Sequence, residues 1–271
     1  MPELPEVETT LQGIKPFVLG ATLSNVVVRN SSLRWPIPVQ SIESLIGEKV
    51  GRIERRAKYI LIYTAKGIIL LHLGMSGSLR VVDVSQESSK HDHLDLEFDC
   101  GKIVRLNDPR RFGCCLFLNE PVHEHRLLAN LGPEPFSNEF DGEHLFSLSR
   151  GKSKAIKNFI MDNKIVVGVG NIYASESLYK AGIRPTRPAQ KVSRARYLRL
   201  AEEIISVLSK AIRAGGTTLN DFTQSDGKPG YFAQELQVYG RSGQACNHCG
   251  SEIKSKVIGQ RNTFYCGTCQ K

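Results

Sequence analysis

CNHCGSEIKSKVIGQRNTFYCGTC, residues 246–269, decides how the C-terminal end of this chain folds. It holds two C-x2-C pairs separated by 16 residues, a spacing typical of a four-thiolate zinc site in which each pair lies on a tight turn. The residues between the pairs predict a short β-hairpin with its turn near Gly259. Two redox-active pairs are the alternative, but the βαβ context of such sites is missing. The predicted ligands of one structural Zn²⁺ are Cys246, Cys249, Cys266 and Cys269.

The other three cysteines are expected to be buried thiols, because Cys100, Cys114 and Cys115 lie in apolar segments that resemble strands. The seven cysteines therefore do not indicate a disulfide framework, and no redox or organic cofactor is expected.

Toward the N-terminus, residues 20–118 predict one short strand after another. These segments are rich in β-branched residues and are separated by Gly, Asp, Asn or Ser, which favours a β-sandwich or barrel-like domain. A short helix is expected near residues 40–46. An amphipathic helix precedes the strands, with its apolar face formed by Leu4, Val7, Leu11 and Ile14.

After residue 120 the pattern changes to helices, expected at 142–149, 152–162, 170–181 and 193–214. The apolar stripe predicted for the last helix is Leu198, Ala201, Ile204, Ile205 and Leu208. The predicted fold class is α+β multidomain. It comprises an N-terminal β-sandwich with a helix at 2–130, a linker at 131–150, a helical domain at 151–235 and a zinc finger at 236–271.

Basic residues outnumber acidic ones, with 36 Lys and Arg against 27 Asp and Glu and a formal charge of +9. This excess favours a polyanionic partner, although a merely solvated basic surface is the alternative. The sequence has no pattern of a signal peptide, and its apolar runs are too short to span a membrane. A cytoplasmic monomer without a membrane partner is expected.

The N-terminal stretch MPELPEVE offers a candidate nucleophile. Once Met1 is removed, the α-amine of Pro2 is a secondary amine beside the carboxylates of Glu3 and Glu6. An α-amine has a pKa of about 7.7–8.0, against about 10.4 for lysine, so part of it is unprotonated at neutral pH. Attack on an aldehyde-type carbon would give an iminium. An ordinary terminus is the alternative.

A candidate anion-binding site lies at the start of the helix that begins around Asn171, after glycines at 168 and 170. Backbone N–H groups at such a helix start suit a phosphodiester, but a tight turn between helices would look the same. Just upstream, Lys152, Lys154 and Lys157 predict a basic edge or a solvated face.

Two turns carry apolar side chains beside glycine: Met75 in LGMSGS and Phe112 in NDPRRFG, which also holds Arg110 and Arg111. An exposed aromatic next to two arginines suits stacking on a nucleic-acid base. Burial of either side chain in the core is the alternative. Lys58 starts a strand and could place a cation near the N-terminal amine.

Two histidines, His91 and His93, lie at the mouth of a strand and could bind phosphate, form hydrogen bonds or bind a metal. Arg261 lies near the finger's hairpin turn.

Taken together, these motifs resemble the bacterial formamidopyrimidine-DNA glycosylase family over the whole chain. The motifs are PELPEVE, RRAKY, LGMSG, KHDH, DPRRFG, DNKIVVGVGNIYASESL, SDGKPGYF and the four-cysteine finger with GQRNTFYC. The PELPEVE opening favours this branch over the endonuclease VIII branch, where Leu4 is typically Gly.

The resemblance implies a bifunctional glycosylase and AP lyase of base-excision repair that acts on damaged double-stranded DNA. It implies that Pro2 attacks C1′ of an oxidised purine nucleotide, that Glu3 transfers protons, and that Lys58 and Arg261 assist β- and δ-elimination. Its implied backbone contacts are His91, Arg110, Lys152 and Asn171. Met75, Arg110 and Phe112 would fill the space of the flipped nucleotide, with Glu6 and Glu176 as supporting carboxylates.

Two alternatives remain open: an endonuclease VIII-like enzyme for oxidised pyrimidines and a non-catalytic zinc protein that binds damaged DNA. One departure from the family concerns the lesion loop. Some members carry a lysine in the TTLxDF stretch, where this chain has Asn220.

Overall fold

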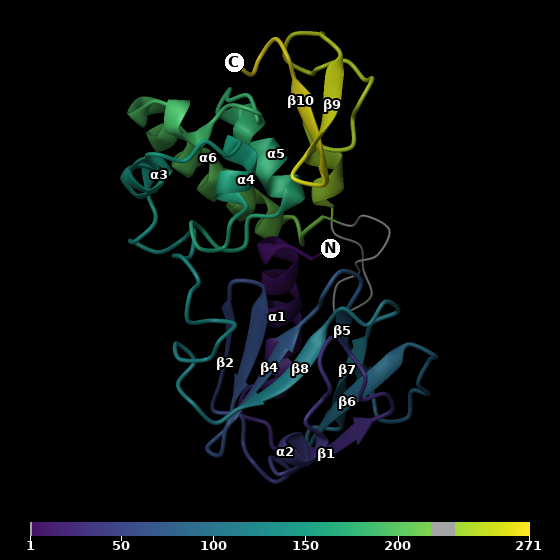
Figure 1. Ribbon diagram of the computed structural model, residues 1–271. Coiled ribbons are helices and arrows are strands. Elements are labelled where there is room, and N and C mark those ends of the chain that lie inside the picture. The colour runs from purple at the N-terminus through teal and green to yellow at the C-terminus, as the bar shows by residue number, and fades with distance from the viewer. Residues whose placement is uncertain (1, 218–230) are drawn as a thin grey trace. The chain divides into compact units, whose positions relative to one another are not determined.

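The computed structural model describes residues 2–217 and 231–271, which form two compact units (Figure 1). Unit 1 spans residues 1–129 and 214–233, and unit 2 spans 130–213 and 234–271. No helix in the described part of the chain is long and apolar enough to cross a membrane.

Unit 1 consists of helix α1 and two four-stranded antiparallel sheets, with a short helix α2 (Figure 1). The first sheet has the order β1-β6-β7-β5 and the second the order β2-β3-β4-β8. The bounds are α1 Leu4–Val18, β1 Leu23–Val28, α2 Val39–Glu43, β2 Arg52–Arg56, β3 Tyr59–Tyr63, β4 Ile68–His72, β5 Ser78–Asp83, β6 Asp92–Phe98, β7 Lys102–Asn107 and β8 Cys114–Leu118. The predicted sandwich with an N-terminal helix is confirmed.

One apolar core joins both sheets and α1. Strand alternation supplies it: Leu94 and Leu96 of β6 face this core, while Asp95 between them lies on the opposite face of its sheet. Helix α1 contributes Val7, Leu11, Ile14 and Val18, which are spaced to lie on one helical face. The N-terminal residues are thereby fixed to the core of the unit.

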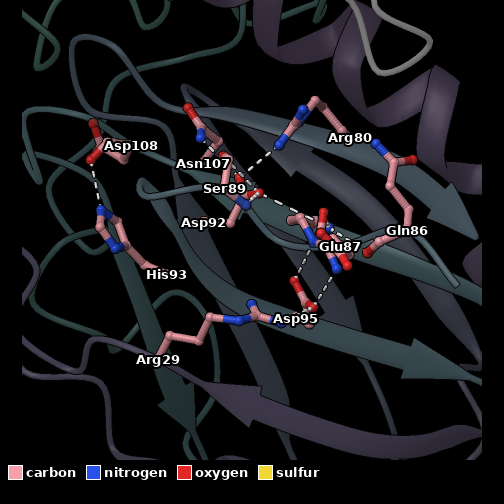
Figure 2. A network of polar contacts seen from close by, with 11 residues as sticks. Arg29, Arg80, Gln86, Glu87, Ser89, Asp92, His93, Asp95, Asn107 and Asp108 are labelled. Atoms are coloured by element: carbon pink, nitrogen blue, oxygen red, sulfur yellow. Dashed lines mark hydrogen bonds and ion pairs between the residues drawn. The ribbon is translucent and has the colours of Figure 1, made fainter. Parts of the chain in front are cut away.

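The outer face of the first sheet carries a network of buried charges (Figure 2). The Asp95 carboxylate accepts two hydrogen bonds from Arg105, at 2.8 and 2.9 Å, and one from Arg29 at 2.6 Å. Asp92 accepts from Arg80 at 2.6 Å and from the Ser89 hydroxyl at 2.9 Å. Arg105 also donates to the carbonyls of residues 86 and 87. The network thus fixes the loop that precedes β6.

We expect Asp95→Asn to lower the free energy of unfolding of unit 1 by about 3 kcal/mol, because it leaves the guanidinium of Arg105 buried without its full partner. Burial raises the pKa of Asp95, but the hydrogen bonds and charges of Arg105 and Arg29 outweigh burial and hold it below its ordinary value. A carboxyl whose pKa is lowered in the folded state stabilises the fold above its unfolded pKa. That contribution is lost as the pH falls through the folded pKa, below about pH 4.

Urea unfolding between pH 7 and pH 3 tests this prediction, with a flatter acid limb expected for Asp95→Asn. Lys102→Ala is the control, because Lys102 pairs with Asp83 at 2.6 Å on the surface. Equal unfolding midpoints for Asp95→Asn and the wild type would contradict it.

Unit 2 contains four α-helices, two 3₁₀ turns and a β-hairpin (Figure 1). The bounds are α3 Gly142–Ser149, α4 Ile156–Ile160, α5 Asn171–Lys180, η1 Ala189–Lys191, α6 Arg194–Arg213, η2 Phe232–Glu235 (of which residues 232–233 belong to unit 1), β9 Ile253–Ile258 and β10 Arg261–Cys266. Helices α3 and α5 both pack against α6, and β10 contacts α5. The hairpin turn falls at Gly259, as predicted.

The observed helices differ from the prediction in two places. Helix α4 is five residues long rather than covering 152–162, because Ala155 is not helical, with ψ 138°, and forms a β-bridge with Pro188. On α6, Leu198 is exposed, and the buried stripe begins with Tyr197 and Leu200. Gly142 of α3 packs directly against the backbone of Leu198, where a Cβ on Gly142 would lie 2.3 Å from the Cα of Leu198.

The division into units also differs from the predicted boundaries. Residues 131–150, expected to be a linker, lie in unit 2, where α3 covers α6. The described residues 214–217 and 231–233 lie in unit 1, where Thr217 bonds to Glu6 and bridges Tyr231. Among the thiols, Cys114 and Cys115 are buried as expected, and burial raises the pKa of both. Cys100 is exposed, because it lies in the turn after β6.

Candidate functional site

The N-terminal end of α1 presents Pro2 and two buried carboxylates. Glu3 is the N-cap residue, and its N–H donates to Oε2 of Glu6 at 2.8 Å in a capping box. Glu3 and Glu6 are both 2% exposed. Pro5 in the first turn fits a helix start, where its missing N–H costs no hydrogen bond. The sequence thus holds the candidate nucleophile in a defined place.

Glu6 also contacts the segment that ends at Gly216 and Thr217. Its Oε1 accepts the N–H of Thr217 at 2.8 Å, and a Cβ on Gly216 would lie 3.2 Å from the same oxygen. Gly216 has φ +81°, so a side chain would be strained as well as crowded there. One carboxylate therefore binds the N-terminal backbone and residue 217. Asn220 and the rest of the expected lesion loop lie outside the described residues.

Lys58 lies in the turn of the hairpin formed by β2 and β3, after Ala57 at φ +54°. This hairpin is joined to α1 by an ion pair between Arg55 and Glu8 at 2.8 Å. Arg55 also donates to the carbonyl of Ala57 at 2.9 Å, which supports the left-handed turn. The ion pair is largely buried, so Lys58 and the N-terminus share one framework.

His72, at the end of β4, was not singled out from the sequence because an isolated histidine at a strand end carries no signal. Burial, together with the nearby charges of Lys58 and Arg34, lowers its pKa to about 4. The ring is therefore neutral at pH 7, and its Nδ1 accepts the N–H of Gly74 at 3.0 Å. His72 also packs against Tyr59, with ring centroids 4.9 Å apart.

The two apolar turn residues are exposed, Met75 at 36% and Phe112 at 46%. Their burial in the core, the alternative, is wrong. The guanidinium of Arg110 lies 5.7 Å from the centre of the Phe112 ring. Unit 1 therefore presents two apolar tips and a cation on neighbouring turns, a surface suited to contact with base faces.

The histidine pair has two environments. His93 is buried, and its Nε2 bonds to the carbonyl of Asp108 at 2.9 Å (Figure 2). His91 is half-buried. In the described part of the chain, the candidate metal-binding cluster of three or more side chains is that of the finger cysteines.

In unit 2, the start of α5 is held by a lysine that the sequence left as part of a basic edge. Lys157 is fully buried rather than solvated. Its ammonium donates to Oδ1 of Asn171 and, at 2.6 Å, to Oγ1 of Thr263. Asn171 donates in turn to the carbonyl of Asn262 at 3.1 Å. These bonds bring the start of α5 to the start of β10, directly beside Arg261.

The remaining predicted site residues of unit 2 differ in their burial and in their hydrogen-bond partners. Arg261 and Lys152 are exposed. Glu176 is buried, and its carboxylate accepts three backbone N–H bonds, each at 2.9 Å. The donors are Gln237, Val238 and Tyr239. In this structure Glu176 holds the chain that leads into the finger.

The four finger cysteines form a compact cluster, with all four Sγ atoms within 4.8 Å of one another. The Sγ atoms are 3.5 Å apart between Cys249 and Cys266 and 3.9 Å apart between Cys246 and Cys269. A tetrahedral Zn²⁺ with bonds of about 2.3 Å places its sulfur ligands about 3.8 Å apart. The Tyr179 hydroxyl lies 3.2 Å from Sγ of Cys246, as an outer partner would. The residues fit a structural zinc ion.

Three family models match the chain. The formamidopyrimidine-DNA glycosylase N-terminal domain covers residues 1–115, the H2TH domain of the same enzymes 131–223, and the zinc finger found in FPG and IleRS 243–271. A formamidopyrimidine-DNA glycosylase of Alteromonas mediterranea is 57% identical over all 271 residues, covering 100% of both chains.

Two solved complexes of the Lactococcus lactis Fpg are similar to the whole chain, each at 30% identity and 100% coverage of both chains. One holds DNA with N7-benzyl-Fapy-dG, at a TM-score of 0.91. The other holds DNA with an oxidised pyrimidine, at a TM-score of 0.90.

Proposed function

Since the chain belongs to the formamidopyrimidine-DNA glycosylase family and is a DNA repair glycosylase, we propose that it excises oxidised purines from duplex DNA through Pro2 and then cleaves the strand. The proposed substrates are 8-oxoguanine and formamidopyrimidines. The observation that carries the proposal is the fixed position of the N-terminus, held by Glu6 and by the helix core beside buried Glu3.

The chemistry begins with the Pro2 amine after Met1 has been removed. Its nitrogen lone pair bonds to C1′ of the flipped nucleotide, the glycosidic bond breaks, and the base leaves with the bonding electron pair and takes up a proton. The attached amine then loses its N–H proton, and its lone pair forms the C=N bond of the iminium as the C1′–O4′ bond breaks. Glu3 donates the proton that O4′ takes up as the sugar ring opens. The iminium withdraws electrons as a lysine Schiff base does, and the α-amine that forms it has a lower pKa than lysine.

Strand cleavage follows from the same intermediate. The iminium acidifies the C2′ proton, whose removal expels the 3′ phosphate, and a second elimination expels the 5′ phosphate. Lys58, on the hairpin tied to α1 by Arg55 and Glu8, assists the first elimination. Arg261, on the finger, assists the second and holds phosphate.

DNA binding is assigned to both units, each on its own evidence. In unit 1, Met75 and Phe112 fill the space left by the flipped nucleotide, Arg110 faces the orphaned base, and His91 binds the backbone. The exposure of Met75, Phe112 and Arg110 supports this role. In unit 2, Asn171 and Lys152 bind backbone phosphates, with Glu176 as a supporting carboxylate.

One structural Zn²⁺ is assigned to the four cysteines, where it holds the finger and takes no part in the reaction. The proposed working form is a monomer on damaged double-stranded DNA, at the chromosome in the bacterial cytoplasm.

A second candidate substrate class is oxidised pyrimidine, because the Lactococcus lactis relative has been solved with such a lesion. Single-turnover rates on matched duplexes that contain 8-oxoguanine or thymine glycol separate the two. Faster turnover of 8-oxoguanine is expected.

Borohydride trapping tests the mechanism. The enzyme, confirmed by mass spectrometry to begin at Pro2, is mixed with an 8-oxoguanine:cytosine duplex and reduced. A covalent complex with the adduct mapped to Pro2 is the expected result. Lesion binding with neither an adduct nor strand cleavage would sink the proposal and favour a non-catalytic damage-binding protein.

A further inference from the structure

One buried carboxylate joins the two turns that carry the exposed apolar side chains. Asp108 is 0% exposed and directly follows β7. Its Oδ1 accepts the hydroxyl of Ser76 at 2.7 Å, and its Oδ2 accepts the N–H of Gly113 at 2.7 Å. Ser76 directly follows Met75, and Gly113 directly follows Phe112. Each oxygen of one side chain therefore holds the base of one turn.

The backbone of Asp108 reaches the histidine segment as well. Its N–H donates to the carbonyl of His91 at 3.0 Å, and its carbonyl accepts from Nε2 of His93 at 2.9 Å, the contact drawn in Figure 2. The Ser76 hydroxyl oxygen additionally accepts the N–H of Arg110 at 3.3 Å. Four residues of unit 1 were assigned above to DNA binding. Each of them lies on a segment that is hydrogen-bonded to Asp108 or Ser76: His91, Met75, Arg110 and Phe112.

The turns also touch through their backbones, so their spacing depends on small residues. A Cβ on Gly74 would lie 2.4 Å from the nitrogen of Gly113, and a Cβ on Gly113 would lie 2.7 Å from the carbonyl oxygen of His72. Arg111 has φ +55°, an unfavourable conformation for a side-chain-bearing residue unless its surroundings hold it. Its N–H bonds to the carbonyl of Asp108 at 3.2 Å, which supplies part of that support.

Hydrogen bonds to a buried carboxylate are stronger than neutral ones, and removing one leaves a buried polar group unsatisfied. Side chains that must enter a base stack together work best when their spacing is set before binding, since otherwise binding has to order them.

We propose that Asp108, with Ser76, is a positioning residue that sets the spacing of Met75, Arg110 and Phe112 in the free protein, so that they enter the DNA stack as one unit. This inference rests on the proposed function, because it assumes that these side chains replace the flipped nucleotide. It adds that the insertion depends on a group that does not contact DNA.

Ser76→Ala is the test variant, and Ser89→Ala is its matched control. Ser89 donates its hydroxyl to the buried carboxylate of Asp92 at 2.9 Å, so both changes remove one hydroxyl from one buried aspartate. Of the two serines, only Ser76 lies in one of the turns that carry Met75 and Phe112. Three measurements at saturating enzyme are compared: excision of 8-oxoguanine, cleavage at a preformed abasic site, and the fluorescence rise of 2-aminopurine placed beside the lesion.

Ser76→Ala is expected to slow excision about tenfold and to reduce the 2-aminopurine rise, which reports unstacking. Cleavage at the abasic site should slow by less than about twofold, because a site without a base is cheaper to extrude. Ser89→Ala should leave all three unchanged. Asp108→Asn should have the same selectivity, and adding Ser76→Ala to it should cause little further slowing, because both act through one contact.

Excision and fluorescence of Ser76→Ala equal to the wild type would overturn the inference. Equal slowing of excision and abasic-site cleavage would overturn it as well, since that result indicates general damage. A wild-type enzyme that binds the lesion without excising it would instead refute the proposed function. The fluorescence comparison would then still decide the positioning role, because it requires only binding.

Discussion

A chain that keeps a residue ahead of Pro2 is expected to lose base excision by at least about a thousandfold, as enzymes do when their nucleophile is removed. With Met1 or any other residue attached, the nitrogen of Pro2 is part of a tertiary amide. Its lone pair is delocalised into the carbonyl and cannot attack C1′. A free α-amine, with a pKa of about 7.7–8.0, is in contrast substantially unprotonated at neutral pH.

The variant for this experiment carries one lysine inserted between Met1 and Pro2, so that Met1 is retained. Its partner is the unchanged sequence, confirmed by mass spectrometry to begin at Pro2. Both should bind an 8-oxoguanine duplex, since the inserted residue leaves unit 2 and the two apolar turns unaltered. Only the partner should excise the base and form a borohydride adduct. Excision by the extended chain at the wild-type rate would assign the nucleophile elsewhere.

Loss of the finger's metal is expected to have the second largest effect, weakening binding to damaged DNA by at least about a hundredfold as phosphate contacts are lost. The finger has a small core, in which Val238 and Ile253 pack with Cys246 and Cys266. So few apolar groups cannot hold a hairpin without a further cross-link. Unfolding of β10 would also remove Thr263 and the Asn262 carbonyl from the ammonium of buried Lys157.

Cys266→Ala tests this prediction, and Cys100→Ala is its control because Cys100 is exposed and outside the cluster. The measurements are bound zinc per chain, hydrogen exchange of residues 243–271, and affinity for a lesion duplex at fixed salt. Cys266→Ala should lose zinc, exchange protection and affinity, while the β-sandwich of unit 1 keeps its protection. Retained protection and affinity without zinc would show that the finger does not need the metal.

Much of the fold followed from short-range pattern. The eight strands of unit 1 all fall within residues 20–118, where β-branched runs predicted one short strand after another, because each strand packs one face on a single core. The zinc finger was also predicted from the sequence, since two cysteine pairs, each with two residues between its cysteines, are typical of a zinc site. The helix at 152–162 was predicted too long, because Ala155 pairs with Pro188, which is distant in sequence.

The residues with the most telling contacts gave weak signals or none in the sequence. Lys157 looked like part of a basic edge, yet it is buried among Asn171 and Thr263. His72 and Asp108 were unremarkable strand-end residues, yet each bonds to a turn that exposes an apolar side chain. Two of these roles depend on partners more than 30 residues away, Ser76 for Asp108 and Thr263 for Lys157. No local pattern specifies such a pairing.

By itself the sequence determined the α+β class, the succession of strands along the chain and the four thiolates. It also determined that removal of Met1 leaves Pro2 with a secondary amine. These depend on periodicity, on ligand spacing and on the covalent chemistry of proline, all of which are local. Only the tertiary structure decided that Glu6 binds both the N-terminus and Thr217, and that Asp108 bonds to both apolar turns. Buried carboxylates need donors, and folding alone determines which distant N–H and O–H groups reach them.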